Sequence, residues 1–284
     1  MLAVYRGCLR DCAGRKPGAF EVASLEQLVA RLGLDQGTEK MRTMRSDFGE
    51  TWVHRTWVGF DTETTGLDVK RERIVTASLV VREGGVNQAG ELQETTWLLN
   101  PRVPISRGAS AIHGITDEIA QTQGMDAMTG LEQVAAALAE HLASRHVLVV
   151  FNAGFDLPLL QRNLQHFGLA TLEERLGHPV VPVADPLVLD RMMVPRRRGS
   201  RKLGSLIAAY GLPEIERAHQ SSDDAAAALA VLGACVRDNY QVLASWSDRE
   251  LMENQRNGHR DWAEDFQAYL RSKGRAARIS PIWF

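Results

Sequence analysis

Hydrophobic positions along the chain follow two different periods, which separates predicted strands from predicted helices. Five short apolar segments predict β-strands, at residues 57–60, 73–81, 91–99, 147–151 and 180–183. The second and third are joined through Glu83-Gly84-Gly85, a sequence typical of a hairpin turn. A buried strand at 57–60 runs directly into Asp61, so polar chemistry begins where this strand ends.

Segments with helical periodicity alternate with the later strands, from about residue 131 onward. Apolar residues recur every three or four positions at Leu131, Val134, Leu138 and Leu142, which is the spacing of one helix face. Helices are predicted at residues 131–145, 155–167, 203–210 and 222–239. Three strands followed by alternating helices and strands predict an α/β fold, with a mixed five-stranded sheet flanked by helices.

The alternating strands and helices lie within residues 53–240, and we expect this α/β domain to have an N-terminal extension, 1–52, and a C-terminal extension, 241–284. In the first, Ser24-Leu25-Glu26-Gln27 predicts a capping box that opens a short helix. In the last, one helix face carries Trp262, Phe266, Tyr269 and Leu270. The chain ends in the apolar residues Ile282, Trp283 and Phe284, which either pack onto their own domain, the favoured interpretation, or bind a partner.

Composition limits the class of protein. Of 284 residues, 44% are hydrophobic and 24% are charged, so there is enough apolar surface for a folded core. Segments of 18 consecutive apolar residues are absent, and arginines interrupt any apolar stretch at the N-terminus, so we expect a cytoplasmic protein without a membrane span. Three scattered cysteines predict reduced thiols, and a net charge of −2 argues against a wholly basic nucleic-acid coat.

The first chemical signal is Asp61-Thr62-Glu63-Thr64-Thr65-Gly66. Strand residues two apart point to the same face, so the carboxylates of Asp61 and Glu63 lie side by side. Two such charges on a buried strand repel each other unless a cation lies between them, and Mg²⁺ or Mn²⁺ has the required preference for oxygen. An exposed strand end with two solvated acids is the alternative.

Two further segments place acids at helix starts. Asn152-Ala153-Gly154-Phe155-Asp156 follows an apolar strand, so Asp156 lies in the first turn of a helix, where an acid either serves a site or simply caps the helix. His219 precedes Asp224 by five positions at the start of an alanine-rich helix. Helix neighbours point about 100° apart, so only one of Asp223 and Asp224 faces a shared site. A capped surface helix with a solvated histidine is the alternative for this segment alone.

Together the three segments predict phosphoryl chemistry with two metal ions. Four acids could hold two divalent cations on a phosphodiester, and a histidine could take the proton of the attacking water. Motifs of P-loop nucleotide hydrolases, zinc proteases, serine hydrolases and dinucleotide-binding domains are absent from the sequence.

In order and spacing, D-x-E-T-T-G, N-x-x-F-D and H-x-x-x-x-D-A resemble the three motifs of the DEDDh 3′–5′ exonucleases, the superfamily of the bacterial DNA polymerase III epsilon subunit. The resemblance covers about residues 55–240. It implies a ribonuclease H-like fold, metal binding by Asp61, Glu63, Asp156 and Asp224, and a general base at His219. The sister DEDDy class would place tyrosine where this chain has Gln220.

The resemblance also implies contacts with the 3′-terminal nucleotide, by residues that flank these motifs. The candidates are Thr64, Thr65, His113, Asn152 and Phe155. His113 has an alternative role as a loop histidine with a structural hydrogen bond. Separately, residues 191–202 contain six Lys and Arg and no acid, which indicates either a phosphate contact or a solvated loop.

We therefore expect a metal-dependent 3′–5′ exonuclease that releases nucleoside 5′-monophosphates from single-stranded or 3′-ended nucleic acid, with DNA favoured over RNA. RNA trimming with the same chemistry is one alternative. A subunit that works mainly through a DNA polymerase or repair partner is another. The sequence leaves the oligomeric state open, and a homodimer is one option because dimers occur among proteins of the class that the chain resembles.

Overall fold

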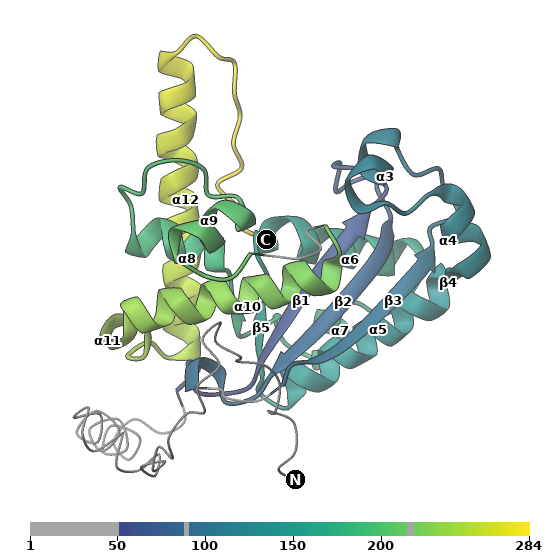
Figure 1. The fold of residues 1–284 in the computed structure, drawn as a ribbon, viewed down its shortest axis with the longest axis horizontal. Coiled ribbons are helices and arrows are strands. Elements are labelled where there is room, and N and C mark those ends of the chain that lie inside the picture. The colour runs from purple at the N-terminus through teal and green to yellow at the C-terminus, as the bar shows by residue number, and fades with distance from the viewer. Residues whose placement is uncertain (1–50, 88–90, 215–218) are drawn as a thin grey trace, which may run out of the picture. The chain divides into compact units, whose positions relative to one another are not determined.

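Six strands form one mixed sheet in the computed structural model, which describes residues 51–87, 91–214 and 219–284. In sheet order they are β4 (Met125–Asp126), β3 (Gln93–Asn100), β2 (Ile74–Arg82), β1 (Trp57–Thr64), β5 (Val147–Val149) and β6 (Val183–Ala184). β1, β2 and β3 are antiparallel, β5 and β6 run parallel to β1, and β4 runs parallel to β3 (Figure 1). The predicted ribonuclease H-like α/β fold is confirmed, with a sixth strand because the two-residue β4 extends the edge.

Helices connect and cover these strands. The longer ones are α5 (Ala127–Ala143), α6 (Ala153–His166), α8 (Pro186–Met193), α10 (Ser221–Asp238) and α12 (Asp248–Ser272). The shorter ones are α3 (Arg107–His113), α4 (Asp117–Gln123), α7 (Leu172–Leu176), α9 (Leu203–Ala209), α11 (Tyr240–Leu243) and the 3-10 helix Gly85–Asn87. The helix expected near Ser24 lies outside the described residues.

The helices and strands predicted after residue 53 are present, most with bounds a few residues from those expected, and the short helix predicted at 203–210 is α9. The helices predicted at 131–145 and 222–239 are α5 and α10, each shifted by a few residues. The strand predicted at 180–183 is reduced to β6, because Pro179 and Pro182 have no N–H to donate to a neighbouring strand. Helices α3, α4, α7 and α8 were not predicted, because each is too short for a clear period.

The two faces of β1 pack against different helices (Figure 1). Val58 and Phe60 belong to the core that α5 and α6 complete, whereas Trp57 packs with residues of α10 on the opposite face. Because side chains alternate along a strand, Asp61 and Glu63 lie on the α10 face and Thr62 lies on the α6 face. This alternation decides which acids meet at the end of β1.

Helix α12 and the last residues belong to the same compact unit as the sheet. Gln255 on α12 is fully buried, where it accepts a hydrogen bond from the Asp185 backbone and donates one to the Val183 carbonyl. At the end of the chain Trp283 is 4% exposed and Ile282 is 72% exposed. The expected packing of the tail onto its own domain therefore holds for Trp283 and not for Ile282. None of the helices in the described residues has the length and apolar character to cross a bilayer.

Candidate active site

The close approach of α10 to β1 begins at Gly59, on the same face as Asp61 and Glu63. A Cβ atom at Gly59 would lie 2.7 Å from the Ala225 carbonyl oxygen of α10. Only glycine therefore permits this separation without a shift of the helix. Two and four residues further along the strand, the carboxylates of Asp61 and Glu63 point toward the start of α10.

Ser221 fixes the first turn of α10 over the sheet. Its hydroxyl lies 3.0 Å from that of Thr76 and 2.7 Å from that of Ser78, both on β2. The same first turn carries Asp224. As a result Asp61, Glu63 and Asp224 each offer a carboxylate oxygen, and these oxygens all lie within 4.8 Å of one another.

The fourth predicted acid, Asp156, reaches the same end of β1 from the opposite face. It is buried in the first turn of α6, and the Thr62 hydroxyl donates to its Oδ1 at 2.6 Å. Asp156 is not part of the three-carboxylate cluster, but its charge raises the pKa of both Asp61 and Glu63. The strand thus separates one acid from the other three while keeping all four in electrostatic contact.

Burial raises the pKa of every one of these acids, and repulsion by the other acids adds to this rise for Asp61 and Glu63. For Asp61 the pKa lies well above its usual value, first because of burial and then because of Asp156, Asp224 and Glu63. The pKa of Glu63 rises to about 8, through burial and the charges of Asp224 and Asp156. Burial raises the pKa of Asp156 to about 7 despite the hydrogen bond from Thr62. The acids therefore resist ionisation together unless positive charge is supplied.

In the part of the chain that the structure describes, that positive charge does not come from an ion pair. None of the four carboxylates pairs there with a lysine or arginine. Clustered carboxylate oxygens are the donors that Mg²⁺ and Mn²⁺ prefer. The residues present therefore fit divalent cations, held by Asp61, Glu63 and Asp224 with Asp156 alongside.

His219 lies beside this cluster at the start of α10. Its side chain is exposed, its backbone has φ of 70°, and its backbone N–H donates to Asp224. Burial raises the pKa of Asp224, while the charge of His219 opposes that rise. The predicted general base is thus next to the predicted metal ligands and open to solvent.

His113 faces the same region from the end of α3, with both ring nitrogens engaged. Nδ1 accepts the Ile115 backbone N–H at 3.1 Å, so the proton belongs on Nε2, which donates to the Thr64 carbonyl at 3.3 Å. Burial lowers the pKa of His113, the hydrogen bond to the Thr64 carbonyl opposes this, and the charge of His219 lowers the pKa further. The structural hydrogen bond that sequence reasoning left as an alternative is present, and a contact with substrate stays a prediction.

The other predicted substrate contacts differ in whether their side chains already form hydrogen bonds within the protein. The hydroxyl of Thr64 donates to the Gly66 carbonyl, and that of buried Thr65 donates to Glu72. Asn152 is exposed in a left-handed conformation before α6, and Phe155 is partly buried against the core. Asn152 and Phe155 therefore have surface available for a ligand, whereas the two threonine hydroxyls are already engaged in hydrogen bonds.

Sequence reasoning missed Asp185, a buried aspartate that supports the helix of Asp156. Asp185 accepts the backbone N–H groups of Asn152 and Ala153 at the start of α6 and those of Leu187 and Val188 at the start of α8. It also accepts the indole N–H of Trp283 at 3.0 Å. The available signal was Asp185-Pro186 after an apolar segment, a typical helix start.

Comparisons with known proteins place this geometry in a family. Residues 58–232 match a family model described as exonuclease, which is more than half of the chain. A DNA polymerase III PolC-type of Halalkalibacterium halodurans is 30% identical over 206 residues, which are 72% of this chain and 13% of that protein. A DNA polymerase III subunit epsilon-like protein of Rhodobacter capsulatus is 39% identical over 108 residues, 38% of this chain and 14% of that one.

Solved structures with the same fold include exonuclease I of E. coli in complex with an oligonucleotide, with a TM-score of 0.56 and 18% identity. Exonuclease I of Methylocaldum szegediense matches with a TM-score of 0.54 and 22% identity. Both matches cover 66% of this chain and 42% of the other. The chain thus spans less than half the length of these proteins, and about an eighth of the polymerase relatives' length.

Proposed function

The chain belongs to the exonuclease family, in its DEDDh 3′–5′ class, and on that premise we propose that it is a metal-dependent exonuclease acting on DNA 3′ ends. The observation that carries the proposal is the cluster of Asp61, Glu63 and Asp224 at the end of a buried strand, with Asp156 close enough to raise the pKa values of Asp61 and Glu63. Bound cations would offset the repulsion among these like charges.

The protein residues divide the work of phosphodiester hydrolysis. Asp61, Glu63, Asp156 and Asp224 would hold two divalent cations. When bound, these cations supply Lewis-acid activation of water and stabilise the charge of the phosphate and of the departing oxygen. His219 has an exposed ring beside Asp224, so it can take a proton from the attacking water and pass it to solvent. The products are a nucleoside 5′-monophosphate and a strand shortened by one nucleotide.

DNA as substrate is supported by the relatives, which are named as DNA polymerase III proteins, and by the exonuclease I structure with a bound oligonucleotide. RNA is the competing substrate, since a metal centre acts on the phosphate and does not read the 2′-hydroxyl. A polymerase or repair partner, and a homodimer, stay predictions.

The direct test is an end-labelled substrate panel with metal titration. With Mg²⁺ or Mn²⁺, the full chain should shorten 5′-labelled single strands from the 3′ end, release mononucleotides, act faster on DNA than on matched RNA, and stop when a chelator is added. Asp224→Asn should lose about 1,000-fold in kcat/KM, because several kcal/mol of metal-derived transition-state stabilisation disappear.

The matched control is Asp223→Asn, one position along the same helix and about 100° away around its axis. It should retain activity within about threefold, since its carboxylate is outside the cluster. His219→Ala should lose about 100-fold to 10,000-fold, the range for a general base. Equal activity of Asp224→Asn and the unchanged chain would remove the proposed site.

A further inference from the structure

The basic loop between α8 and α9 is held in place and remains positively charged. Residues 191–202 contain six Lys and Arg and no acid. Arg197 and Arg201 both pair with Asp190, which is fully buried and also accepts the Tyr210 hydroxyl. One carboxylate thus anchors two guanidinium groups, while Arg196, Arg198 and Lys202 stay exposed.

A stack of aromatic rings lies along α12 opposite this loop. Trp262, Phe266 and Tyr269 recur at the spacing of one helix face. The Trp262 and Phe266 rings are 5.5 Å apart at 16°, and the Phe266 and Tyr269 rings are 6.5 Å apart at 15°. Phe266 is 38% exposed and Tyr269 is 55% exposed. Two nearly parallel rings therefore present surface to solvent on a rigid helix.

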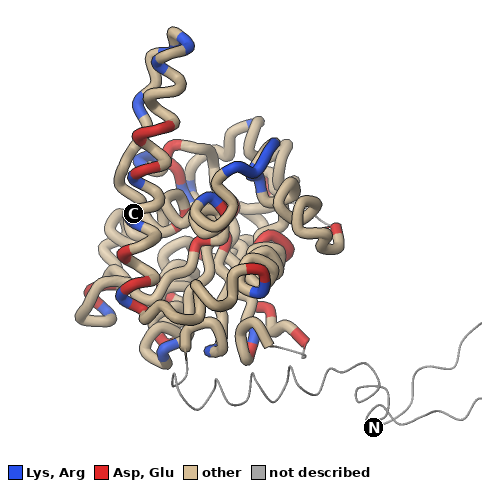
Figure 2. The backbone as a smooth tube through the Cα atoms, turned by 90° about the vertical axis from the view of Figure 1, so that its left-hand side faces the viewer, with Lys and Arg blue, Asp and Glu red and all other residues tan. Residues whose placement is uncertain are grey.

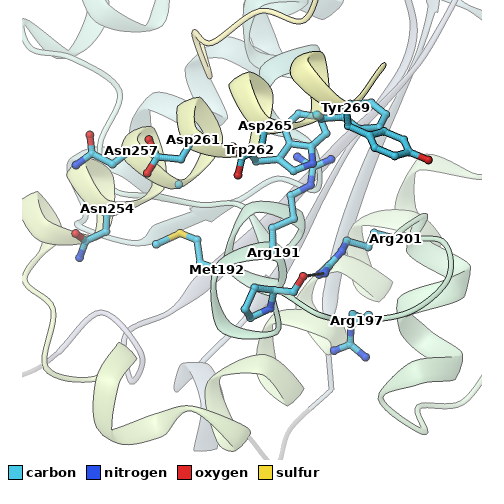
Figure 3. A pocket seen from close by; sticks show the side chains of 13 residues that line it. Arg191, Met192, Arg197, Arg201, Asn254, Asn257, Asp261, Trp262, Asp265 and Tyr269 are labelled. Atoms are coloured by element: carbon cyan, nitrogen blue, oxygen red, sulfur yellow. Dashed lines mark hydrogen bonds between the residues drawn. The ribbon is translucent and has the colours of Figure 1, made fainter. Parts of the chain in front are cut away.

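The loop and the stack line one pocket of about 780 Å³, here called the α8–α12 pocket (Figure 3). The Arg191 guanidinium, from the end of α8, lies 3.4 Å from the centre of the Trp262 ring. Arg197 and Arg201 line the pocket from the loop, and Tyr269 lines it at the other end of the stack. Residues 191–202 contain no aromatic residue, and the fold supplies aromatic rings to the pocket from α12.

Positive charge continues past the aromatic stack. Residues 266–284 contain four Lys and Arg and no acid, and the Lys273 ammonium lies 5.8 Å from the Tyr269 ring centre. Figure 2 shows basic residues on the projecting end of the α12 segment, above acidic ones. Asp261 and Asp265 line the pocket from α12 (Figure 3). Phosphates are therefore favoured on the loop side and beyond Tyr269, and disfavoured beside these two aspartates.

We propose that the α8–α12 pocket binds single-stranded nucleic acid, with bases stacked on Phe266 and Tyr269 and phosphates held by the loop arginines. Exposed rings in series beside a basic groove suit a polymer that carries both a π-face and a phosphate at every residue. A protein partner would instead be expected to cover a larger apolar area than two half-exposed rings. As a substrate site, this inference rests on the proposed function.

The pocket also lies near the candidate active site. Asp185 joins the start of α6, which carries Asp156, to the start of α8, which ends near Arg191. Eight helical residues span about 12 Å. A strand with its 3′ end in the active site therefore reaches the pocket only when several nucleotides lie upstream, and affinity should rise with strand length.

The test measures binding without cleavage, in full-length chain carrying Asp61→Asn, by the fluorescence anisotropy of labelled oligothymidylates. Adding Phe266→Ala with Tyr269→Ala should weaken binding of a strand of about 20 nucleotides by roughly tenfold or more, since each base–ring stack contributes. A trinucleotide should bind the two proteins equally. The matched control is Met128→Ala, which removes another exposed apolar side chain, on α5.

Charge substitutions provide an independent arm. Arg196→Glu with Arg198→Glu should weaken binding of the long strand and lower the dependence of log K on log salt by about 1.4, which corresponds to two phosphate contacts on a single strand. Arg237→Glu, an exposed arginine at the far end of α10, should leave binding unchanged. Asp261→Asn with Asp265→Asn should strengthen binding, because it removes the negative charge beside the strand.

The outcomes separate this inference from the proposed function. If the chain with intact Asp61 degrades DNA but the aromatic substitutions change neither binding nor the KM for long strands, the pocket inference is wrong and the nuclease assignment stands. If nothing is degraded while binding still depends on the rings, the strand-binding surface stands and the nuclease assignment falls. If the substitutions alter only the molar mass in solution, the surface is a contact between copies of the chain and the inference is overturned.

Discussion

Two acidic centres in this molecule have opposite electrostatic arrangements. At Asp190, two arginines and the Tyr210 hydroxyl surround a single carboxylate that is fully shielded from solvent. At the end of β1, three carboxylates gather with a fourth close by, and within the described residues none forms an ion pair with lysine or arginine. Protein side chains neutralise the charge of the first centre, whereas the charge of the second is neutralised only when cations bind.

The difference indicates which acids serve the fold and which serve chemistry. A compensated buried ion pair costs stability when one partner is removed, because the other charge is left unpaired. An uncompensated cluster should behave in the opposite way, since removing one charge relieves repulsion among the rest. Strain of this kind is typical of functional sites.

The same isosteric substitution at both centres should give the largest contrast. Asp61→Asn should reduce kcat/KM by about 1,000-fold and leave the melting temperature in chelator unchanged or higher. Asp190→Asn should lower the free energy of unfolding by about 3 kcal/mol, because it leaves Arg197 and Arg201 without their partner. Its activity per folded molecule on a trinucleotide, which is too short to reach the α8–α12 pocket, should stay close to that of the unchanged chain.

Exonuclease assays at matched folded concentration, together with thermal unfolding, measure both quantities. A fall in melting temperature for Asp61→Asn, with stability retained in Asp190→Asn, would reverse the assignment of the two centres.

Gly59 tests whether the acidic centre depends on the separation between β1 and α10. In Gly59→Ala, the new Cβ would meet the Ala225 carbonyl oxygen, so α10 has to move and carry Asp224 away from Asp61. We expect a loss of about 100-fold in kcat/KM and about 1–3 kcal/mol in stability. Gly204→Ala is the control, because nothing lies within 4 Å of a Cβ there. If the two variants have the same activity, the close approach does not position the site.

These two centres also show how far sequence reasoning reached. The four acids and His219 follow from strand alternation, helix starts and motif order, because each signal is local. Local sequence does not predict the role of Gly59, the hydrogen bonds of Ser221 to β2 or the hydrogen bonds that converge on Asp185. These features depend on contacts between distant parts of the chain. Asp185 and Trp283, for example, are 98 residues apart.

Short elements were missed for a related reason. Helix α8 has eight residues and starts at Asp185-Pro186, so its period is too brief to detect, although its cap is recognisable. Its omission hid the position of Arg191, and with it the pairing of the basic loop with the aromatic face of α12.

Metal addition should stabilise the chain through the β1 centre only. Mn²⁺ at about 100 times its dissociation constant should add about 2.7 kcal/mol, which raises the melting temperature by about 5–10 °C. The shift should persist in Asp190→Asn and disappear in Asp61→Asn and Asp224→Asn. A shift of equal size in all four proteins would place the bound metal elsewhere.

The pH dependence of stability without metal should have the sign set by the raised pKa values. The pKa of Glu63 is raised to about 8 and that of Asp156 to about 7. At pH values between the ordinary pKa of a carboxyl group and these raised values, the folded chain therefore binds more protons than the unfolded chain. Stability from this centre is therefore present at low pH and lost as pH rises toward 8.

Denaturant unfolding in chelator measures this change in the free energy of unfolding with pH, which should be the smallest effect of the four tests. In Asp61→Asn the free energy of unfolding should depend less on pH, because one repelling charge is gone. Stability from this centre that instead increased from pH 5 to pH 8 would contradict the predicted repulsion.

The most direct test is the anomalous scattering of crystals of the full chain soaked in Mn²⁺. The account predicts anomalous peaks within coordination distance of the carboxylate oxygens of Asp61, Glu63 and Asp224, with Asp156 beside them and no peak at Asp190. Manganese bound only at other residues, or carboxylates of Asp61 and Asp224 directed to separate surfaces, would contradict it.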